Sequence, residues 1–291
     1  MSQFAPKSIL CPLDLSSSSP IILRWASLIA GFYTSKLQVL HAEWMEYPRY
    51  FLPSQAAQLA AESERARTSI RDDLQRLVKE TIPDEIPREI TVLEGHPIEK
   101  ILEYAERHRP DLIVMGSHGR SGVARMRLGS VAENVVQQAS SPTLVVHAPG
   151  GKPAPSKISG ILCPVIFDEH SARTISLSAA LAAATGAHLI VMHVEEADLP
   201  PEVNRKQLCE SVPSDARAHC DVVEVVRQGS AAEQILHVAR EYEVDIIVLT
   251  ARHRQFLDFT VIGTTTEKVM RHADSAVLVV PAQEYLLSSA G

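Results

Sequence analysis

Residues 111–146 have the sequence DLIVMGSHGRSGVARMRLGSVAENVVQQASSPTLVV, in which two apolar runs enclose a glycine-containing loop and a helical stretch. The loop opens with Gly116 and Gly119, and after nine further residues Gly129 and Ser130 begin the helical stretch. Continuous apolar runs of this length are typical of strands buried on both faces of a parallel sheet. The stretch therefore predicts a strand, a loop at its carboxyl end, a helix and a second strand.

The same alternation extends over the first half of the chain. Apolar runs predict strands, and the longer amphipathic segments between them predict helices, one with Pro20 in its first turn and Gly31 near its end. The strands are expected at residues 8–13, 37–42, 89–93, 111–116 and 142–146, and the helices at 20–31, 54–80, 97–107 and 130–139. This order predicts an α/β domain with a five-stranded parallel sheet flanked by helices.

The chain repeats this pattern. Leu10-Cys11-Pro12 and His41 recur 152 residues later, as Leu162-Cys163-Pro164 and His193. Gly95, Asp111, Gly129 and Val145-Val146 recur 134 residues later, as Gly229, Asp245, Gly263 and Val279-Val280. The fall in the offset from 152 to 134 means that the first copy has 18 extra residues between His41 and Gly95, which we interpret as an enlarged element and not as a separate domain.

The repeat sets the expected domain boundaries: a first domain at residues 1–147, a linker at 148–157 and a second domain at 158–291. The linker sequence APGGKPAPSK is rich in Pro and Gly and has no apolar period. Strands of the second copy are expected at 161–165, 189–194, 222–226, 245–249 and 276–280. Three prolines within residues 195–216 leave the presence of its second helix open.

The composition argues against several classes of partner. The chain has 28 Lys and Arg against 35 Asp and Glu, a net charge of -7, so we expect no nucleic-acid or membrane-surface partner. The N-terminal sequence lacks a secretory signal and no apolar run reaches the roughly 18 residues of a membrane span, so a cytoplasmic location is expected. The four cysteines form no CxxC pair, and we expect free thiols.

The loop after residue 116 predicts an anion-binding site. Ligands of open α/β sheets bind at the carboxyl ends of the strands, and glycines there let backbone N–H groups approach a phosphate closely. The helix beginning at Ser130 adds N–H groups, the positive end of a helix dipole and a hydroxyl. For Arg120, Arg125 and Arg127, phosphate contact and exposure to solvent are equally good interpretations. A GxxxxGK[ST] motif is absent and no GxGxxG follows the first strand, which disfavours a P-loop kinase or an ordinary dehydrogenase.

The stretch from Gly116 to Val146 closely resembles the Gly-x2-Gly-x9-Gly-Ser loop of ATP-binding universal stress proteins, and residues 9–14, ILCPLD, resemble the first strand of that family. The resemblance covers nearly the entire chain, twice. It implies two tandem Rossmann-like domains of the adenine nucleotide alpha hydrolase-like type. It also implies bound ATP or a related adenine nucleotide, which Mg²⁺ can accompany.

The same resemblance implies the residues of the site. Asp14 would face the adenosine, and Ala42 and Met115 would lie beside the adenine. Because Asp14 precedes a serine run, a role in an Asx turn or a helix cap is the alternative. The full set of expected ligand contacts is Pro12, Asp14, Ala42, Met115, Gly116, Gly119, Arg120, Gly129, Ser130 and Val131.

The second copy has lost much of this loop. Thr250 stands where the first copy has Gly116, and His253 stands where it has Gly119, with Gly263-Thr264 in place of Gly129-Ser130. Ile166 replaces Asp14, and Asp168 is a candidate partial substitute two residues later. Larger side chains at glycine positions cost free energy or obstruct a phosphate. We therefore expect a nucleotide in the first domain alone.

The last strands of the two copies, residues 143–146 and 276–280, predict how the domains associate. Both are apolar, and the family resemblance places each at the edge of its sheet, where two domains meet. An apolar edge invites pairing, which a tandem chain satisfies internally at high effective concentration. We expect an intramolecular pseudo-dimer, and further homodimerisation stays open.

The sequence is compatible with three functions. The first is a regulatory protein that binds an adenine nucleotide during stress, the second is a slow ATPase or nucleotide-transferring enzyme, and the third is a module for a lipid or other small ligand. The sequence shows no obvious catalytic base beside the loop, so at most weak ATP hydrolysis is expected.

No HxxxH or HExxH spacing occurs among the 12 histidines, so we expect no dedicated metal site. His41 and His193 are expected to be structural, and His118 to belong to the loop or face solvent.

Overall fold

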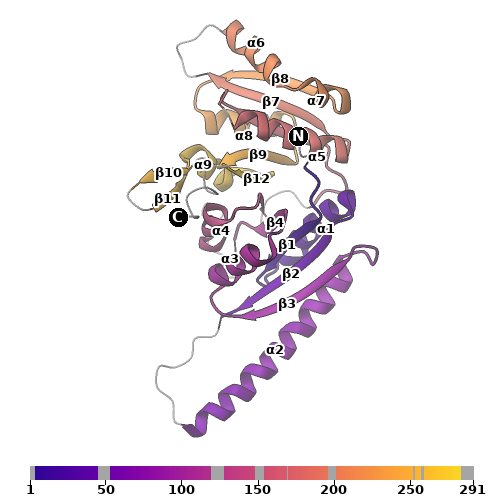
Figure 1. The fold of residues 1–291 in the computed structure, drawn as a ribbon, viewed down its shortest axis with the longest axis vertical. Helices are drawn as coiled ribbons and strands as arrows, with labels where there is room; N and C mark the ends of the chain where they lie inside the picture. Colours follow the sequence, from indigo (N-terminus) through magenta and orange to yellow (C-terminus); the bar gives the residue numbers. More distant parts are fainter. Residues whose placement is uncertain are drawn as a thin grey trace.

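A computed structural model describes residues 4–44, 53–118, 128–147, 154–168, 170–195, 201–251, 253–256 and 259–282. Its central feature is one ten-stranded sheet that runs through both halves of the chain (Figure 1). The strand order is β3-β2-β1-β4-β5-β12-β9-β6-β7-β8. Five strands come from each half in the equivalent order, and within each half all neighbours are parallel.

The first half contains nine elements in strict alternation. They are β1 (Ser8–Leu13), α1 (Ser19–Tyr33), β2 (Lys36–Glu43), α2 (Pro53–Thr81), β3 (Arg88–Glu94), α3 (Pro97–His108), β4 (Leu112–Gly116), α4 (Ser130–Gln138) and β5 (Thr143–Val146). All were predicted, and each end lies within two residues of its expected position. The continuous apolar runs are strands because both faces of the sheet are covered by helices.

The second half repeats this order with two differences. Its elements are β6 (Gly160–Val165), α5 (Ser171–Thr185), β7 (His188–Glu195), α6 (Pro201–Ser211), α7 (Ser214–His219), β8 (Val222–Gln228), α8 (Ala231–Glu241), β9 (Ile246–Ala251), β10 (His253–Phe256), β11 (Phe259–Ile262), α9 (Thr264–His272) and β12 (Ala276–Pro281). Two short helices, with Pro213 as the N-cap of the second, replace the single helix α2. The antiparallel hairpin β10–β11 occupies the place of the glycine loop and was not predicted.

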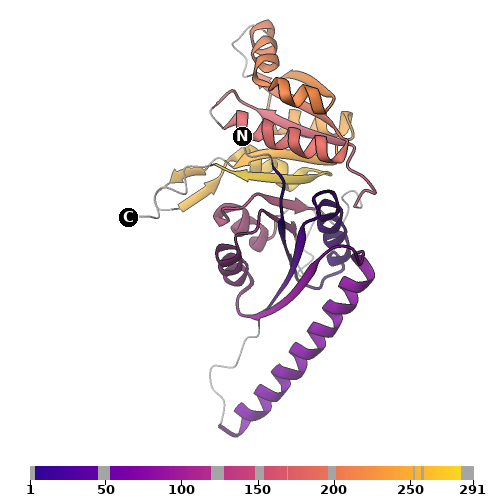
Figure 2. The same cartoon turned by 45° about the vertical axis from the view of Figure 1, so that its right-hand side comes forward.

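Buried side chains form one apolar layer on each face of the sheet, and both layers extend across the two halves. Helices α1, α2, α5, α6 and α7 contribute to one layer, and helices α3, α4, α8 and α9 to the other. The enlarged element of the first copy is α2, which packs through Leu74 and Val78 near its C-terminal end. Its N-terminal part extends away from the sheet (Figure 2).

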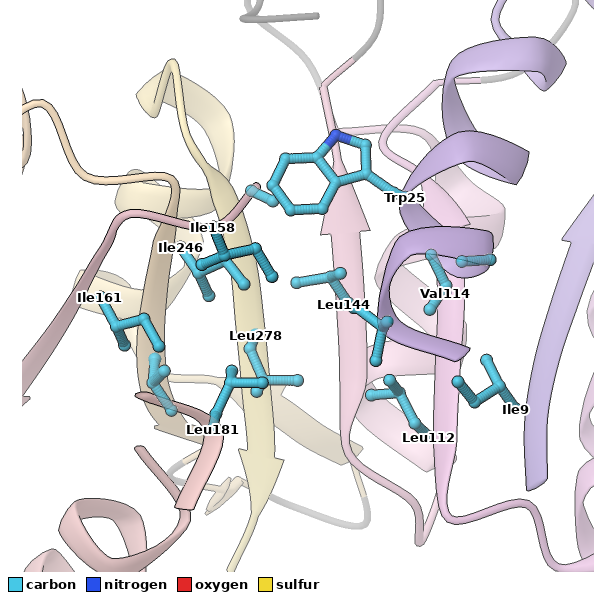
Figure 3. Packing of buried hydrophobic residues seen from close by; sticks show 14 of the residues in the cluster. Ile9, Trp25, Leu112, Val114, Leu144, Ile158, Ile161, Leu181, Ile246 and Leu278 are labelled. Carbon is cyan, nitrogen blue, oxygen red and sulfur yellow. The ribbon is translucent and has the colours of Figure 1, made fainter. Parts of the chain in front are cut away.

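The two halves join through their last strands, as expected. Strand β5 pairs antiparallel with β12, with Leu144 opposite Leu278 and Val145 opposite Val277. All four side chains are buried. Figure 3 shows Leu144 and Leu278 on these neighbouring strands, with Trp25 of α1 and Ile158 extending the apolar contact. The edge of each five-stranded sheet is therefore covered by the other half.

None of the helices within the described residues combines the length and the apolar character that crossing a membrane requires. The expected linker, residues 148–157, lies partly outside the described part of the chain, which resumes at Ala154.

Candidate functional site

A cavity of about 600 Å³ opens at the carboxyl ends of β1, β2 and β4 in the first half. The chain order of the strands changes direction between β1 and β4, and in open α/β sheets ligands bind at such a switch point. Eight expected contact residues line this cavity, namely Pro12, Asp14, Ala42, Met115, Gly116, Gly129, Ser130 and Val131. The other two, Gly119 and Arg120, lie outside the described residues, as do Arg125 and Arg127.

The two ends of the glycine loop are fastened together at the cavity. The backbone N–H of Ser117 donates to the carbonyl of Val146 at 2.9 Å, and the N–H of Gly129 donates to the carbonyl of Ser117 at 2.8 Å. The first bond joins the ends of β4 and β5, and the second brings the start of α4 next to the end of β4. Gly129 has the extended conformation of an N-cap, with φ -68° and ψ 145°, and no side chain caps the helix.

The first turn of α4 supplies the donors of the cavity. Ser130, Val131 and Ala132 line it, and the first N–H groups of a helix have no partner within the helix. The intrahelical pattern begins with the N–H of Glu133, which donates to the carbonyl of Gly129. An anion at this position would meet N–H groups and the positive end of the helix dipole.

Gly116 is a glycine because of the space around it. A Cβ at this position would lie 2.7 Å from Cδ1 of Ile22 and 3.3 Å from the carbonyl oxygen of His118. Ile22, on α1, and Gly116, at the end of β4, both line the cavity. Any other residue at position 116 would therefore press against Ile22, whose side chain also lines the cavity.

Asp14 forms an Asx turn and also lies in the wall of the cavity. Its Oδ1 accepts a hydrogen bond from the Ser16 N–H at 3.0 Å and lies 3.4 Å from the Ser19 hydroxyl, which is an Asx turn leading into α1. The residue also lines the cavity. The turn fixes the position of a carboxylate at the cavity wall.

Much of the cavity wall is apolar. Leu40, Met115 and Ile101 are buried there, and Ile70 comes from α2, the element that the second half lacks in this form. Trp44 is 53% exposed at the same site and meets the His96 ring edge to face, with 5.0 Å between ring centroids. An apolar wall beside a helix N-terminus suits a ligand with a flat organic part and an anionic part.

Sequence reasoning missed several residues of this cavity. His118 lines it, and its Nδ1 lies 2.9 Å from the Ser117 hydroxyl. Glu43, Trp44 and Ile70 also line it. Glu43 sits one residue after Ala42 on a strand whose other residues are mostly apolar, and that contrast was the one available signal.

Comparisons with known proteins identify the family. A model described as the universal stress protein family matches residues 6–147 and 158–281. The chain belongs to the universal stress protein family. A universal stress protein of Mycolicibacterium smegmatis is 23% identical over 290 residues, covering 94% of this chain and 96% of the relative. The universal stress protein MJ0531 of Methanocaldococcus jannaschii is 52% identical over 58 residues, which are 20% of this chain and only 34% of that relative.

Solved structures show the same fold. A universal stress protein from Archaeoglobus fulgidus matches with a TM-score of 0.70 at 18% identity, covering 96% of this chain and 97% of that one. Another solved universal stress protein is in complex with cAMP. It covers 43% of this chain and 98% of its own, at 20% identity and a TM-score of 0.37.

In the second repeat, different side chains occupy the equivalent positions. Thr174 and Thr250 occupy the positions of Ile22 and Gly116, and their hydroxyl oxygens lie 2.7 Å apart, in hydrogen-bonding contact. Ile166, at the position of Asp14, is 50% exposed. Asp168 accepts hydrogen bonds from the backbone N–H and the hydroxyl of Ser171 at the start of α5. Ser171 corresponds to Ser19, so Asp168 contacts the same serine position that Asp14 approaches in the first repeat, but from two residues further along the chain.

His41 and His193 have the same structural contact in the two repeats. Nδ1 of His41 lies 2.8 Å from the carbonyl oxygen of Leu13, and Nδ1 of His193 lies 2.9 Å from that of Val165. Each ring therefore ties the end of a second strand to the end of a first strand. Among the described residues, no group of three or more His, Cys, Asp and Glu side chains is arranged to hold a metal ion.

The four cysteines are free thiols. Cys11 and Cys163 occupy equivalent buried positions on β1 and β6, and burial raises the pKa of Cys163 to about 12. Burial likewise raises the pKa of Cys11. Both thiols stay protonated at neutral pH, so they act as small apolar core residues.

Proposed function

We propose that this universal stress protein binds ATP or a related adenine nucleotide in the cavity of its first half, and that occupancy of this site regulates the protein during stress. The observation that carries the proposal is the junction of β4 and α4. There, Gly116, where a Cβ would press against Ile22, and the uncapped N-terminus of α4 lie beside the same cavity.

The geometry matches the parts of a nucleotide. The first-turn N–H groups of α4 would donate to phosphate oxygens, and the Ser130 hydroxyl would add one more donor. The apolar wall around Leu40, Ala42 and Met115 would face the base. Asp14 would accept hydrogen bonds from the ribose hydroxyls. The complex of another family member with cAMP is consistent with an adenine nucleotide as the ligand.

The fit of a metal ion is a separate matter. Mg²⁺ is held by oxygen ligands and commonly by phosphate oxygens together with few protein groups. Ser130 is the residue at the start of α4 that would approach it, and the ion would neutralise phosphate charge. Mg²⁺ is not needed to hold the phosphates, because the backbone N–H groups at the start of α4 would already face them.

A proline substitution tests the role of the helix N-terminus. Ser130→Pro removes the N–H and the hydroxyl at the first position of α4, where proline is well tolerated, and Gly129 already has the extended backbone that precedes proline. We expect the affinity for ATP to fall by about tenfold or more, since hydrogen bonds to charged groups are the strong ones. Isothermal titration calorimetry measures this affinity.

The second repeat offers the matched control. Thr264→Pro makes the same change at the start of α9, where Gly263 has φ -57° and ψ 140°. ATP binding should stay at the wild-type level in this variant, and both variants should keep the wild-type melting temperature within a few degrees. Wild-type affinity in Ser130→Pro, or no ATP binding to the wild-type protein, would contradict the proposal.

A further inference from the structure

Glu43 is a buried carboxylate in the wall of the cavity. It is the last residue of β2, its side chain is 8% exposed, and none of the described residues donates a hydrogen bond to its Oε2. An ionised carboxylate only accepts hydrogen bonds, and burying one without a donor costs free energy. A ligand that brings an N–H group to Glu43 would recover that cost.

The neighbouring strand explains why Glu43 lacks this donor. Glu94 of β3 is directly opposite Glu43 in the register of the parallel pair, so both side chains lie on one face of the sheet. The guanidinium of Arg67, from α2, forms an ion pair with Glu94 and a longer one with Glu64 on its own helix. Two carboxylates therefore lie side by side, and Glu94 is the one that is paired with this arginine.

The second repeat shows the same position with its donor in place. Glu195 corresponds to Glu43 and is also buried, and Gln228 corresponds to Glu94. The Gln228 Nε2 donates to Oε2 of Glu195 at 3.0 Å. A neighbouring amide thus donates to one oxygen of Glu195, whereas the carboxylate of Glu94 has no donor to offer Glu43.

The position of Glu43 along the cavity indicates which ligand group would donate to it. Strand β1 lies between β2 and β4, so Glu43 is about 10 Å, or two strand spacings, from the strand that leads to α4. The cavity therefore has an anion-binding end at α4 and an anionic, hydrogen-bond-accepting end at Glu43. A phosphate would be repelled from the Glu43 end, which orients the ligand.

We propose that Glu43 is a specificity-determining residue that accepts a hydrogen bond from the exocyclic amino group of the base. This inference rests on the proposed function and deepens it. The preferred ligand is then a nucleotide with an amino group on the base edge that faces β2, as adenine has. Hypoxanthine carries a carbonyl oxygen in place of that amino group, and two acceptors would face each other there.

A comparison of ATP with inosine triphosphate tests this assignment. The wild-type protein should bind ATP at least about tenfold more tightly than inosine triphosphate, because a hydrogen bond to a charged group is gained in one case and lost in the other. In Glu43→Gln the side chain can both donate and accept, so the preference should fall below about threefold. Glu195→Gln, the equivalent change in the second repeat, should leave the wild-type preference intact.

The outcomes separate the two proposals. If the wild-type protein binds ATP but shows the same preference in Glu43→Gln, or binds both nucleotides equally, the role of Glu43 is wrong and the proposed function stands. If the wild-type protein binds neither nucleotide, the proposed function is wrong and this inference falls with it.

A Glu43→Gln melting temperature at or above the wild-type value would show that the comparison is made on a folded protein. If Glu43→Gln unfolds, Glu43→Asp provides the second test. Its shorter carboxylate moves the acceptor back from the base, and a preference equal to that of the wild type would overturn the proposal.

Discussion

The hydroxyl oxygens of Thr174 and Thr250 lie 2.7 Å apart in the second repeat, at the two positions that Ile22 and Gly116 occupy in the first. In the first repeat the same space contains the Ile22 side chain and no Cβ on residue 116. The two repeats have therefore changed both partners of one contact. The threonine on β9 packs beside a shorter, hydrogen-bonding residue on α5.

This relationship predicts the behaviour of a single and a double variant. Gly116→Thr alone places a side chain against Cδ1 of Ile22, and such overpacking costs about 1–3 kcal/mol. We expect a lower free energy of unfolding and a large loss of ATP affinity. Gly116→Thr combined with Ile22→Thr recreates the pair of the second repeat, so it should regain most of the stability but not the affinity. Urea denaturation and calorimetric titration measure the two quantities. Wild-type ATP affinity in the double variant would show that this space is not part of the nucleotide site.

The junction of the two halves makes a second prediction. Val145 is fully buried between Met115 of β4 and Val277 of β12. Val145→Lys buries an unpaired ammonium group there, at a cost of several kcal/mol. We expect the single thermal transition to split and new intermolecular association to appear as the freed strand edge finds other partners. Val225→Lys, in β8 near the far edge of the sheet, should lower stability without separating the halves. A single transition at unchanged temperature in Val145→Lys would contradict the assignment of this contact.

His147 predicts a dependence of stability on pH. Its Nε2 lies 2.5 Å from the carbonyl oxygen of Met270 on α9, across the junction. Burial lowers the pKa of His147, and the charge of His118 lowers it further, whereas the bond to Met270 opposes both. In the unfolded chain His147 has the ordinary histidine pKa near 6.5, so it takes up a proton below that pH, whereas in the folded protein it stays neutral to a lower pH. The free energy of unfolding therefore falls as the pH drops from about 6.5 toward the pKa of His147 in the folded protein.

The variant His147→Gln isolates this contribution. A glutamine amide can still donate to the Met270 carbonyl but does not titrate. The urea midpoint should therefore fall less between pH 7 and pH 5 in His147→Gln than in the wild-type protein. An equal fall in both proteins would mean that His147 titrates in the folded state as it does in the unfolded chain.

Most of the fold could be predicted from the sequence because it depends on local patterns. Apolar runs, amphipathic periods and the repeat offset located all ten strands of the main sheet, and the 18 extra residues corresponded to the larger α2. The hairpin β10–β11 was missed because residues 253–262 were interpreted only as a glycine loop that had lost its glycines. The short helices α6 and α7 were left open because prolines interrupt the pattern there.

The residues of the candidate site that belong to a sequence motif were predicted, and those that tertiary packing brings to the site were missed. The spacing from Gly116 to Ser130 and the family resemblance indicated eight residues that do line the cavity. Glu43 was missed because its importance depends on Glu94, which is adjacent only through the strand register, and on Arg67, which comes from another element. The compensation between Thr174 and Thr250 was equally invisible, since 76 residues separate them in the chain.

The central claim is that one nucleotide binds per chain, in the first repeat. The measurement that tests it most directly is the stoichiometry of ATP binding by isothermal titration calorimetry on the full chain, with the protein concentration determined independently. The close packing of Gly116 against Ile22 in the first repeat and the Thr174–Thr250 contact in the second predict a ratio of about one nucleotide per chain, reduced to zero in Gly116→Thr. Two equivalent sites per chain, or one site that persists unchanged in Gly116→Thr, would contradict the account.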